Sequence, residues 1–173
     1  MRKEYIERMV QAIDPQNAEY IMQDGELVRD FMRAAEYLRK GNVKLAVFVL
    51  KNAKRKVSEF SSRYLTPANI RVGDGVTVNL WSDRHAATVI RVTKATVTVR
   101  RDKATLNPDF KPEFIAGGFV GHCTNQNEQS YTYQPDSDGE EYIFRWSRKF
   151  QRYGQPGNLT LSKGRHEFYD YNF

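Results

Sequence analysis

The sequence predicts an α+β protein, with a small helical bundle at residues 1–66 followed by a strongly bent antiparallel β-domain at residues 70–173. The apolar residues recur at helical spacing up to Thr66-Pro67 and then alternate with polar residues, which is the period of a strand. Four aromatic residues fall within the last six positions. Because loose termini are usually polar, this end is expected to pack against the sheet.

The first helices are marked by an apolar stripe and by capping residues. The stripe runs from Tyr5 to Ile13 and predicts one helix. Asp14-Pro15 suits an N-cap followed by proline at the first helical position, so a short second helix is expected to end near Gly25. A third helix follows the apolar residues between positions 27 and 38, and Gly41 is its expected C-terminal stop.

The last helix of the bundle is predicted to be the longest, with Asn42 as its N-cap. Its apolar stripe consists of Val43, Ala46, Val47, Leu50, Val57, Phe60 and Tyr64. A residue that precedes a proline is displaced from the helical region, so Thr66-Pro67 should end this helix. The boundary between the two domains is therefore expected at residues 66–72.

The β-domain is expected to begin with a glycine turn at residues 72–75. Three strands should follow at residues 76–80, 86–92 and 95–101, because these runs are rich in β-branched residues that alternate with polar ones. This succession of short strands and tight turns is typical of a small barrel of the SH3-like type. Residues 104–127 contain prolines and adjacent glycines and predict a long loop.

Two more strands are predicted at residues 131–133 and 142–146, joined by a turn at residues 136–139. Most of their aromatic rings are expected in the core, because they alternate as core and surface positions of a strand do. Strands at residues 159–161 and 167–173 should then close the sheet.

The composition is typical of a folded protein with a net positive charge. With 40% hydrophobic and 13% aromatic residues among 173, the chain can form a packed core. Its formal net charge of +6 favours an anionic partner such as nucleic acid. The single cysteine, Cys123, excludes an internal disulfide and suits a reducing cytoplasm. We expect neither a signal peptide nor a membrane span, because no apolar run suits either.

A first group of candidate binding residues is Trp81, Asp83, Arg84 and His85. In an extended strand, Trp81, Asp83 and His85 point to one side and Arg84 to the other. An Asp–His pair near an arginine could do acid–base chemistry on a phosphodiester, and a purely structural hairpin end is another interpretation. A binding surface is preferred, because tryptophan and arginine are enriched where interfaces carry their energy.

His122 and Cys123 are adjacent in the sequence. A metal site would require His85, His122, Cys123 and His166 to converge, and the chain has no paired-cysteine spacing of the kind that marks structural zinc sites. A cysteine nucleophile activated by a histidine is an alternative. We expect instead a small buried thiol, with no metal and no cofactor.

Asn125, Gln126 and Glu128 belong to a dense polar run at residues 125–129. Amide side chains offer paired donors and acceptors, which suits base edges or a peptide backbone. The alternative is a loop that forms hydrogen bonds with itself.

Lys51, Lys54 and Arg55 form the clearest basic patch, and Lys51 and Arg55 share one face of the predicted helix. Phosphates or an acidic protein surface could bind this face, but the pattern slightly favours a face exposed to solvent alone. Arg101 and Lys103 follow a predicted strand, where a small barrel can offer a basic groove to a single strand of nucleic acid.

Six short motifs follow one another in the second part of the chain: Val-Gly-Asp-Gly at 72–75, Trp-Ser-Asp-Arg-His-Ala at 81–86, Arg-Asp-Lys-Ala at 101–104, Gly-His-Cys-x-Asn-Gln-x-Glu-Gln at 121–129, Tyr-x-Tyr at 131–133 and Tyr-Asp-Tyr-x-Phe at 169–173. With these motifs, residues 72–173 resemble a family of small proteins encoded by bacteriophages, prophages and other mobile elements of bacteria. The resemblance implies a shared β-domain and no particular activity. Residues 1–66 lie outside it.

The expected function is therefore binding without catalysis, by a mobile-element accessory protein in the cytoplasm of a bacterial host. Its partner would be a host defence nuclease or another nucleic-acid-handling complex. A looser likeness to anti-CRISPR proteins, in size and context, makes inhibition of a type II CRISPR effector nuclease the most concrete form. The alternatives are a direct DNA- or RNA-binding regulator and an enzyme that acts on nucleic acid through Asp83, His85, His122 or Cys123.

Overall fold

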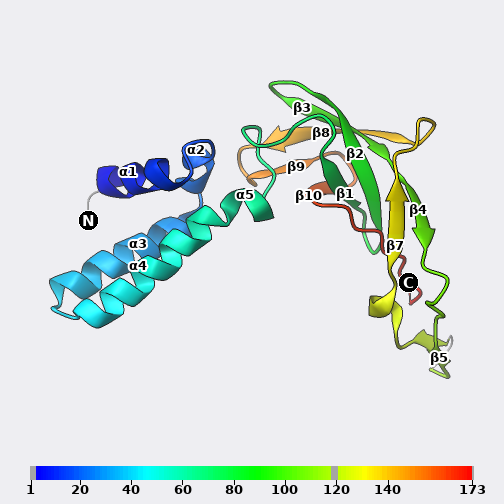
Figure 1. Ribbon diagram of the computed structural model, residues 1–173, viewed down its shortest axis with the longest axis horizontal. Coiled ribbons are helices and arrows are strands. Elements are labelled where there is room, and N and C mark those ends of the chain that lie inside the picture. The colour runs from blue at the N-terminus through cyan, green and yellow to red at the C-terminus, as the bar shows by residue number, and fades with distance from the viewer. Residues whose placement is uncertain (1–2, 118–120, 173) are drawn as a thin grey trace. The chain divides into compact units, whose positions relative to one another are not determined.

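The computed structural model describes residues 3–117 and 121–172. The chain divides into two compact units, Met1–Asn69 and Ile70–Phe173, and each is described by itself (Figure 1). The first unit is helical and the second is built from antiparallel strands that include a small barrel, so the predicted α+β class is confirmed. None of the described helices combines the length and the apolar character that a membrane-spanning segment needs.

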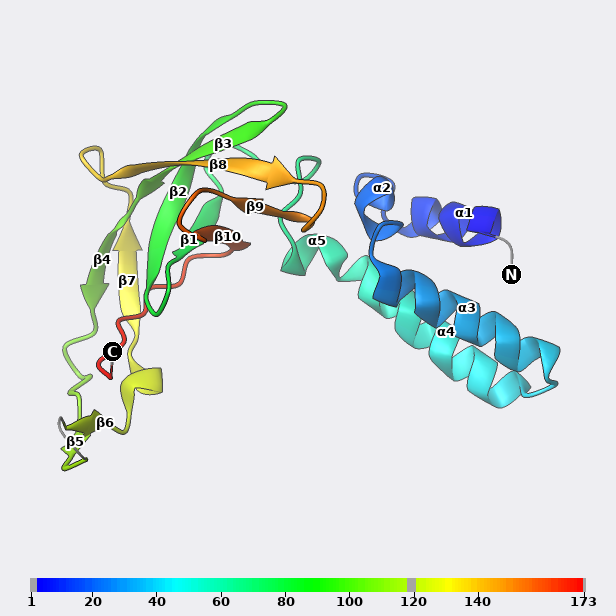
Figure 2. The ribbon, with the colours of Figure 1, turned by 180° about the vertical axis from the view of Figure 1, so that it is seen from behind.

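The helical unit consists of α1 (Lys3–Ile13), α2 (Ala18–Ile21), α3 (Gly25–Arg39), α4 (Val43–Ser58) and α5 (Phe60–Arg63). The long helices α3 and α4 lie side by side in both ribbon views (Figures 1 and 2). Each of these helices contributes buried side chains to one core: Ile6, Val10, Ala18, Ile21, Leu27, Phe31, Ala53, Val57 and Phe60. Their spacing of three or four residues places them on one face of each helix.

The ends of α3 and α4 follow their capping residues. The side chain of Asp24 accepts hydrogen bonds from two amides in the first turn of α3, at 3.0 and 3.1 Å. The side chain of Asn42 accepts one from an amide in the first turn of α4, at 3.1 Å. Gly41 stands between the helices with φ +74°, in the left-handed region that favours glycine. The predictions for Asn42 and Gly41 are confirmed.

Two predicted helix limits are wrong. Gly25, expected to end the second helix, is the first residue of α3, because Asp24 caps the helix there, and α2 already ends at Ile21. The longest helix ends at Ser58 and not at Thr66-Pro67. In addition, the predicted apolar stripe does not lie on one buried face. The exposed members of that stripe are Val43, Val47 and Tyr64.

The β unit is organised around a closed antiparallel barrel. Its strands are β1 (Gly75–Asn79), β2 (Arg84–Val92), β3 (Thr96–Arg101), β8 (Glu141–Ser147), β9 (Arg152–Gly154) and β10 (Thr160–Lys163). They are ordered β1-β10-β9-β8-β3-β2, and β2 pairs with β1 to complete the ring. The interior is filled mainly by Val76, Val78, Ala87, Val89, Val97, Val99, Phe144, Tyr153 and Leu161. β10, which corresponds to the strand predicted at residues 159–161, closes the barrel as expected, whereas the second strand predicted to close it, at residues 167–173, is not formed by the described residues 167–172.

The chain leaves the barrel through Asp102, which separates β3 from β4 (Lys103–Leu106). β4 pairs with β7 (Tyr131–Gln134), and β5 (Phe114–Ile115) pairs with β6 (His122–Cys123) further out, followed by the short helix η1 (Gln126–Glu128). We call residues 103–134 the arm, because its strands extend away from the barrel (Figure 1).

The arm corrects two predictions. Residues 104–127 are not one long loop, since they include β4, β5 and β6. The predicted strands at residues 131–133 and 142–146 do not pair with each other, because β7 pairs with β4 and β8 pairs with β3. The connection between them passes close to the barrel at Gly139, where a Cβ atom would collide with the carbonyl oxygen of Arg101, so a residue without a side chain is required.

Residues 164–172, which we call the C-terminal segment, turn away from β10 at Gly164 and run beside the arm (Figures 1 and 2). Their single described ladder contact is an isolated bridge between Arg84 and Phe168. The aromatic end therefore packs on the β unit, as expected, but without forming a strand. Gly118 of the predicted loop and Phe173 of the predicted last strand lie outside the described residues.

Candidate functional site

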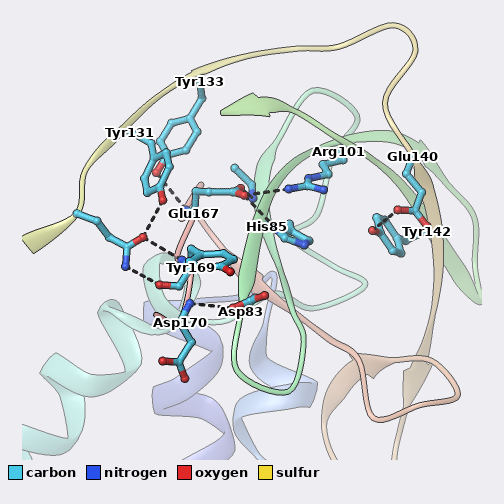
Figure 3. A network of polar contacts seen from close by, with 12 residues as sticks. Asp83, His85, Arg101, Tyr131, Tyr133, Glu140, Tyr142, Glu167, Tyr169 and Asp170 are labelled. Atoms are coloured by element: carbon cyan, nitrogen blue, oxygen red, sulfur yellow. Dashed lines mark hydrogen bonds and ion pairs between the residues drawn. The ribbon is translucent and has the colours of Figure 1, made fainter. Parts of the chain in front are cut away.

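Two of the polar residues that the sequence singles out, His85 and Arg101, meet at Glu167, where the C-terminal segment contacts the barrel (Figure 3). The Glu167 side chain is buried. Its Oε1 lies 3.0 Å from Nδ1 of His85 and accepts a hydrogen bond from Nη2 of Arg101 at 3.1 Å. Its Oε2 accepts a hydrogen bond from the amide of Ala86 at 2.8 Å. Two cationic or polar side chains and one backbone group thus engage both carboxylate oxygens.

These contacts shift the pKa of Glu167. Burial alone would raise the pKa, because the charged form loses its hydration. The hydrogen bonds from His85 and Ala86 and the charges of His85 and Arg101 outweigh burial, so the pKa of Glu167 falls below its ordinary value of 4.5. A carboxyl with a depressed pKa in the folded state stabilises the fold above pH 4.5, and this contribution is lost as the pH falls through the folded-state pKa.

We therefore expect the β unit to lose stability on acidification, and the Glu167→Gln variant to lose less over the same range. The variant should also unfold at a lower temperature at neutral pH, because a neutral amide cannot balance the charge of Arg101. Thermal unfolding followed by tryptophan fluorescence from about pH 6 to about pH 3 measures both effects. Glu128→Gln, which changes an exposed carboxylate, is the control and should keep the wild-type pH dependence. An unchanged acid dependence in Glu167→Gln would contradict this assignment.

The first candidate group is divided by the fold. Residues 81–83 form the turn between β1 and β2, in which the amide of Leu80 bonds to the carbonyl of Asp83, so this stretch is the hairpin end of the alternative interpretation and not an extended strand. Asp83 accepts a hydrogen bond from the amide of Asp170 at 2.9 Å, while His85 contacts Glu167. The Arg84 guanidinium lies over the ring of Phe168, and Trp81 is 83% exposed. The partner of His85 is therefore 82 residues away in the sequence and not the neighbouring aspartate.

The amide run at residues 125–129 is used mainly to hold backbone of this same chain. Gln126 accepts a hydrogen bond from the amide of Tyr171 at 3.0 Å. Gln129 contacts both the amide and the carbonyl of Tyr169, at 2.9 and 2.8 Å. Asn125 contacts the backbone of the loop at residues 111–113. Both interpretations of this run therefore apply, because its amides bind a peptide backbone and that backbone belongs to the same chain. Glu128 is exposed.

The tyrosines beside this run act as hydrogen-bond donors or acceptors. The hydroxyl of Tyr131 donates to Gln129 at 2.7 Å, and that of Tyr133 accepts from the amide of Glu167 at 3.2 Å (Figure 3). Burial, followed by the charge of Tyr171, raises the pKa of Tyr131 to about 12. The phenol is therefore protonated at neutral pH, and its proton is committed to Gln129.

The four residues considered for a metal site occupy different environments. His85 contacts Glu167, and His166 is exposed and stacks on Phe168 at a centroid distance of 6.5 Å. His122 lies in β6, beside the buried thiol of Cys123. Within residues 3–117 and 121–172, no group of three or more histidine, cysteine or acidic side chains has the geometry to hold a metal ion.

The predicted basic residues lie on two separate elements. Lys51, Lys54 and Arg55 are exposed on α4, and Arg55 forms an ion pair with Glu59 at 3.0 Å. Arg101 is bound to Glu167, while Lys103 is exposed on β4.

A second region, which the sequence analysis missed, lies on the barrel around β8 and β9. It is a hollow of about 740 Å³. The residues that line it are Ile143, Arg145, Trp146, Ser147, Phe150, Arg152, Gly154, Gln155, Pro156, Asn158, Leu159 and Thr160. We call this hollow the β8–β9 groove, and none of the predicted binding residues lines it.

The β8–β9 groove combines an exposed aromatic ring with the cationic side chains of Arg145 and Arg152, and Lys149 lies beside that ring. Phe150 is 61% exposed in the turn between the two strands. The Nζ atom of Lys149 lies 5.3 Å from the centroid of its ring, and the guanidinium carbon of Arg152 lies 5.4 Å from it. Trp146 is half-buried and packs edge-on against Tyr153, at a centroid distance of 5.1 Å. The ring of Trp146 thus contributes to the groove. Of the rings predicted to lie mostly in the core, only that of Phe144 is fully buried, and those of Tyr131, Tyr133, Tyr142 and Trp146 are half-buried, so that prediction is wrong.

A signal for this groove was present in the sequence. Residues 142–166 contain six lysines and arginines and no acidic residue. The alternation of rings in this stretch masks the basic residues at positions 145, 148, 149 and 152.

Comparison with known proteins adds no relative. No family model, no curated protein and no solved structure matches this chain.

Proposed function

We propose that this protein binds single-stranded nucleic acid, without catalysis, through the β8–β9 groove. The observation that carries the proposal is the exposed ring of Phe150 between Lys149 and Arg152. A base can stack on such a ring because every base has an aromatic face, while neighbouring cations contact the phosphates on either side. The absence of acidic residues from positions 142–166 leaves this attraction unopposed along the local sequence.

The geometry favours a single strand over a duplex. In a duplex the faces of the bases are stacked on one another, so an exposed ring can reach them only after the pairing is disrupted. In a single strand the bases can turn out and stack on protein rings. The groove offers Phe150 as such a platform and Arg145 as a further cation on its wall.

The arrangement around Glu167 supports binding without catalysis. A general base must reach a substrate proton, and both oxygens of Glu167 already contact His85, Arg101 and the Ala86 amide. These interactions hold the C-terminal segment on the barrel, which is a structural role.

The test is fluorescence anisotropy with a labelled single-stranded oligonucleotide of about 20 nucleotides and with a duplex of the same sequence. We expect the single strand to bind more tightly, and its affinity to fall linearly with salt on logarithmic axes. Phe150→Ala should weaken binding by about 5- to 150-fold, the cost of about 1–3 kcal/mol for one lost base stack. Phe150→Trp should keep the affinity, because it preserves an aromatic face.

Trp81→Ala is the matched control, since it removes an exposed ring that does not line the groove. If Trp81→Ala abolished binding and Phe150→Ala did not, the site would lie at the β1–β2 turn and the groove would be the wrong assignment. If neither oligonucleotide bound, the proposal itself would be overturned.

A second candidate function is inhibition of a host nucleic-acid-handling complex, most concretely a type II CRISPR effector nuclease, in the bacterial cytoplasm. An exposed apolar and basic face on α4 favours it, because binding of a strand in the groove does not need such a face. A pull-down from host lysate at moderate salt, with and without nuclease treatment, tests this candidate. A stoichiometric nuclease that remains bound after the treatment supports it, and recovery of nucleic acid alone contradicts it.

A further inference from the structure

The outer face of α4 carries three apolar side chains that are exposed to solvent. Val43 and Val47 are each 58% exposed, and Phe48 is 62% exposed. The opposite side of α4 packs on the helical core through Ala53 and Val57, so this helix has one buried side and one side that is apolar without being covered.

The same outer face is basic. Positions 44, 48 and 51 lie within about two turns of each other on a helix, and positions 43, 47 and 54 lie on the same face within about three turns, so lysines flank the apolar side chains. Residues 43–58 contain no aspartate or glutamate. We call Val43, Lys44, Val47, Phe48, Lys51 and Lys54 the α4 face.

The lysines of the α4 face differ from the other cations of the helix. Arg55 pairs with Glu59 at 3.0 Å, and Lys56 pairs with Asp30 at 2.7 Å. Among the ion pairs of the described residues, none engages Lys44, Lys51 or Lys54. Their charges are therefore available to a partner.

We propose that the α4 face binds an acidic protein surface, with Phe48 as the apolar anchor and the lysines opposite carboxylates of the partner. Interfaces typically combine an apolar centre with a polar rim, and complementary charge steers the encounter. An apolar anchor in the centre carries most of the binding energy of such a contact. This proposal does not depend on the β8–β9 groove.

The charges and the apolar residues argue against other occupants. A second copy of this chain would bring the same lysines face to face in a symmetric contact, and like charges repel. Nucleic acid would use the lysines but would leave Phe48 and the valines without a role. An anionic membrane binds helices with a wide stripe of large apolar residues, whereas Phe48 is the one large ring on this face.

The experiment places a photo-crosslinking benzoylphenylalanine at position 48 of the full chain, expressed in bacterial cells. We expect one recurrent crosslinked protein, whose crosslinked peptide lies among aspartates and glutamates beside an apolar residue. The same amino acid at Tyr5, which is 58% exposed on α1, is the control and should not capture that protein.

Quantitative binding to the purified partner completes the test. Phe48→Ala should weaken binding to the partner about tenfold or more. The double variant Lys51→Glu, Lys54→Glu should also weaken binding, and changing the matching acidic residues of the partner to lysine should restore it. Circular dichroism should show unchanged folding, because these side chains are exposed. Phe48→Ala should leave oligonucleotide binding intact. The proposal for the α4 face can therefore fail without contradicting the proposal for the β8–β9 groove. Crosslinking to a second copy or to nucleic acid, binding to phosphatidylglycerol vesicles, or no specific protein adduct would each overturn the proposal.

Discussion

Replacement of Arg165 by methionine is expected to lower the free energy of unfolding of the β unit by about 3 kcal/mol, the low end of the cost of removing one partner from a buried ion pair, because the Arg165 side chain is 30% exposed. The Nε atom of Arg165 lies 2.6 Å from Oδ2 of Asp102, whose side chain is almost completely buried. The hydroxyl of Thr88 donates to the other oxygen of Asp102 at 2.6 Å and accepts from Nη2 of Arg165 at 2.8 Å. Methionine keeps much of the apolar stem and removes the charge, so Asp102 would be left buried without its cation.

The ion pair of Asp102 and Arg165 lies where three parts of the β unit meet. Asp102 is the residue at which the chain passes from the barrel into the arm, and Arg165 is the second residue of the C-terminal segment. Gly75 at the start of β1 leaves room for the guanidinium, since a Cβ atom there would lie 2.5 Å from Nη1 of Arg165. The pair thus fastens the arm and the C-terminal segment to the barrel at one point.

Urea unfolding followed by tryptophan fluorescence measures the effect, because Trp81 and Trp146 both belong to the β unit. Arg100→Met is the matched control, since Arg100 pairs with Glu141 at 2.6 Å on the surface and such exposed pairs contribute about 0–1 kcal/mol. Equal losses in the two variants would contradict the assignment. Combining Arg165→Met with Asp102→Leu should recover part of the stability, because the uncompensated carboxylate is then removed as well.

Neutralising the β8–β9 groove is expected to have the largest effect on binding. The triple variant Arg145→Gln, Lys149→Gln and Arg152→Gln should bind a single-stranded oligonucleotide about 100-fold more weakly at low salt, as loss of several phosphate contacts implies. The slope of affinity against salt on logarithmic axes should become shallower by about 2, since each phosphate contact on a single strand contributes about 0.7. Titrations by fluorescence anisotropy at several salt concentrations give both quantities.

The helical unit supplies a control of equal charge. Replacing Lys44, Lys51 and Lys54 by glutamine also lowers the net charge by three, but on α4. This variant should retain the affinity and the salt dependence of the wild type. If both triple variants lost affinity to the same extent, binding would reflect the overall charge of the protein and not a groove.

The elements that were predicted correctly are those whose signals are local. Asn42 and Gly41 define a helix boundary through contacts within one turn, and the alternation in residues 76–101 marks the first three strands of the barrel. What could not be predicted depends on distant partners. The pairing of β7 with β4, and of His85 with Glu167, joins residues that are far apart in the sequence.

The C-terminal segment shows why its prediction as a strand was wrong. Its aromatic run has the composition of a strand, but its backbone is held by the side-chain amides of Gln126 and Gln129 in place of a neighbouring strand. The side chain of Asn172 in turn contacts the backbone of Cys123 in the arm. The sequence reveals amides and rings, and it does not reveal which backbone the amides will contact. The β8–β9 groove is a different case. The basic run without acidic residues at positions 142–166 is a local signal, but the alternation of aromatic residues in the same stretch indicates a core strand instead.

The closure of the barrel by β10 has a consequence for folding during synthesis on the ribosome. β1 is the first strand to be synthesised, and it pairs with a strand that is translated 81 to 87 residues later, from Asn79 with Thr160 to Val76 with Lys163. The helical unit draws its core from residues 6–60 and can fold while the rest is still being synthesised, since domains fold as units and the N-terminal one first. The nascent β strands must wait for β10 to emerge, and until then their edges are open to chaperones or to neighbouring chains.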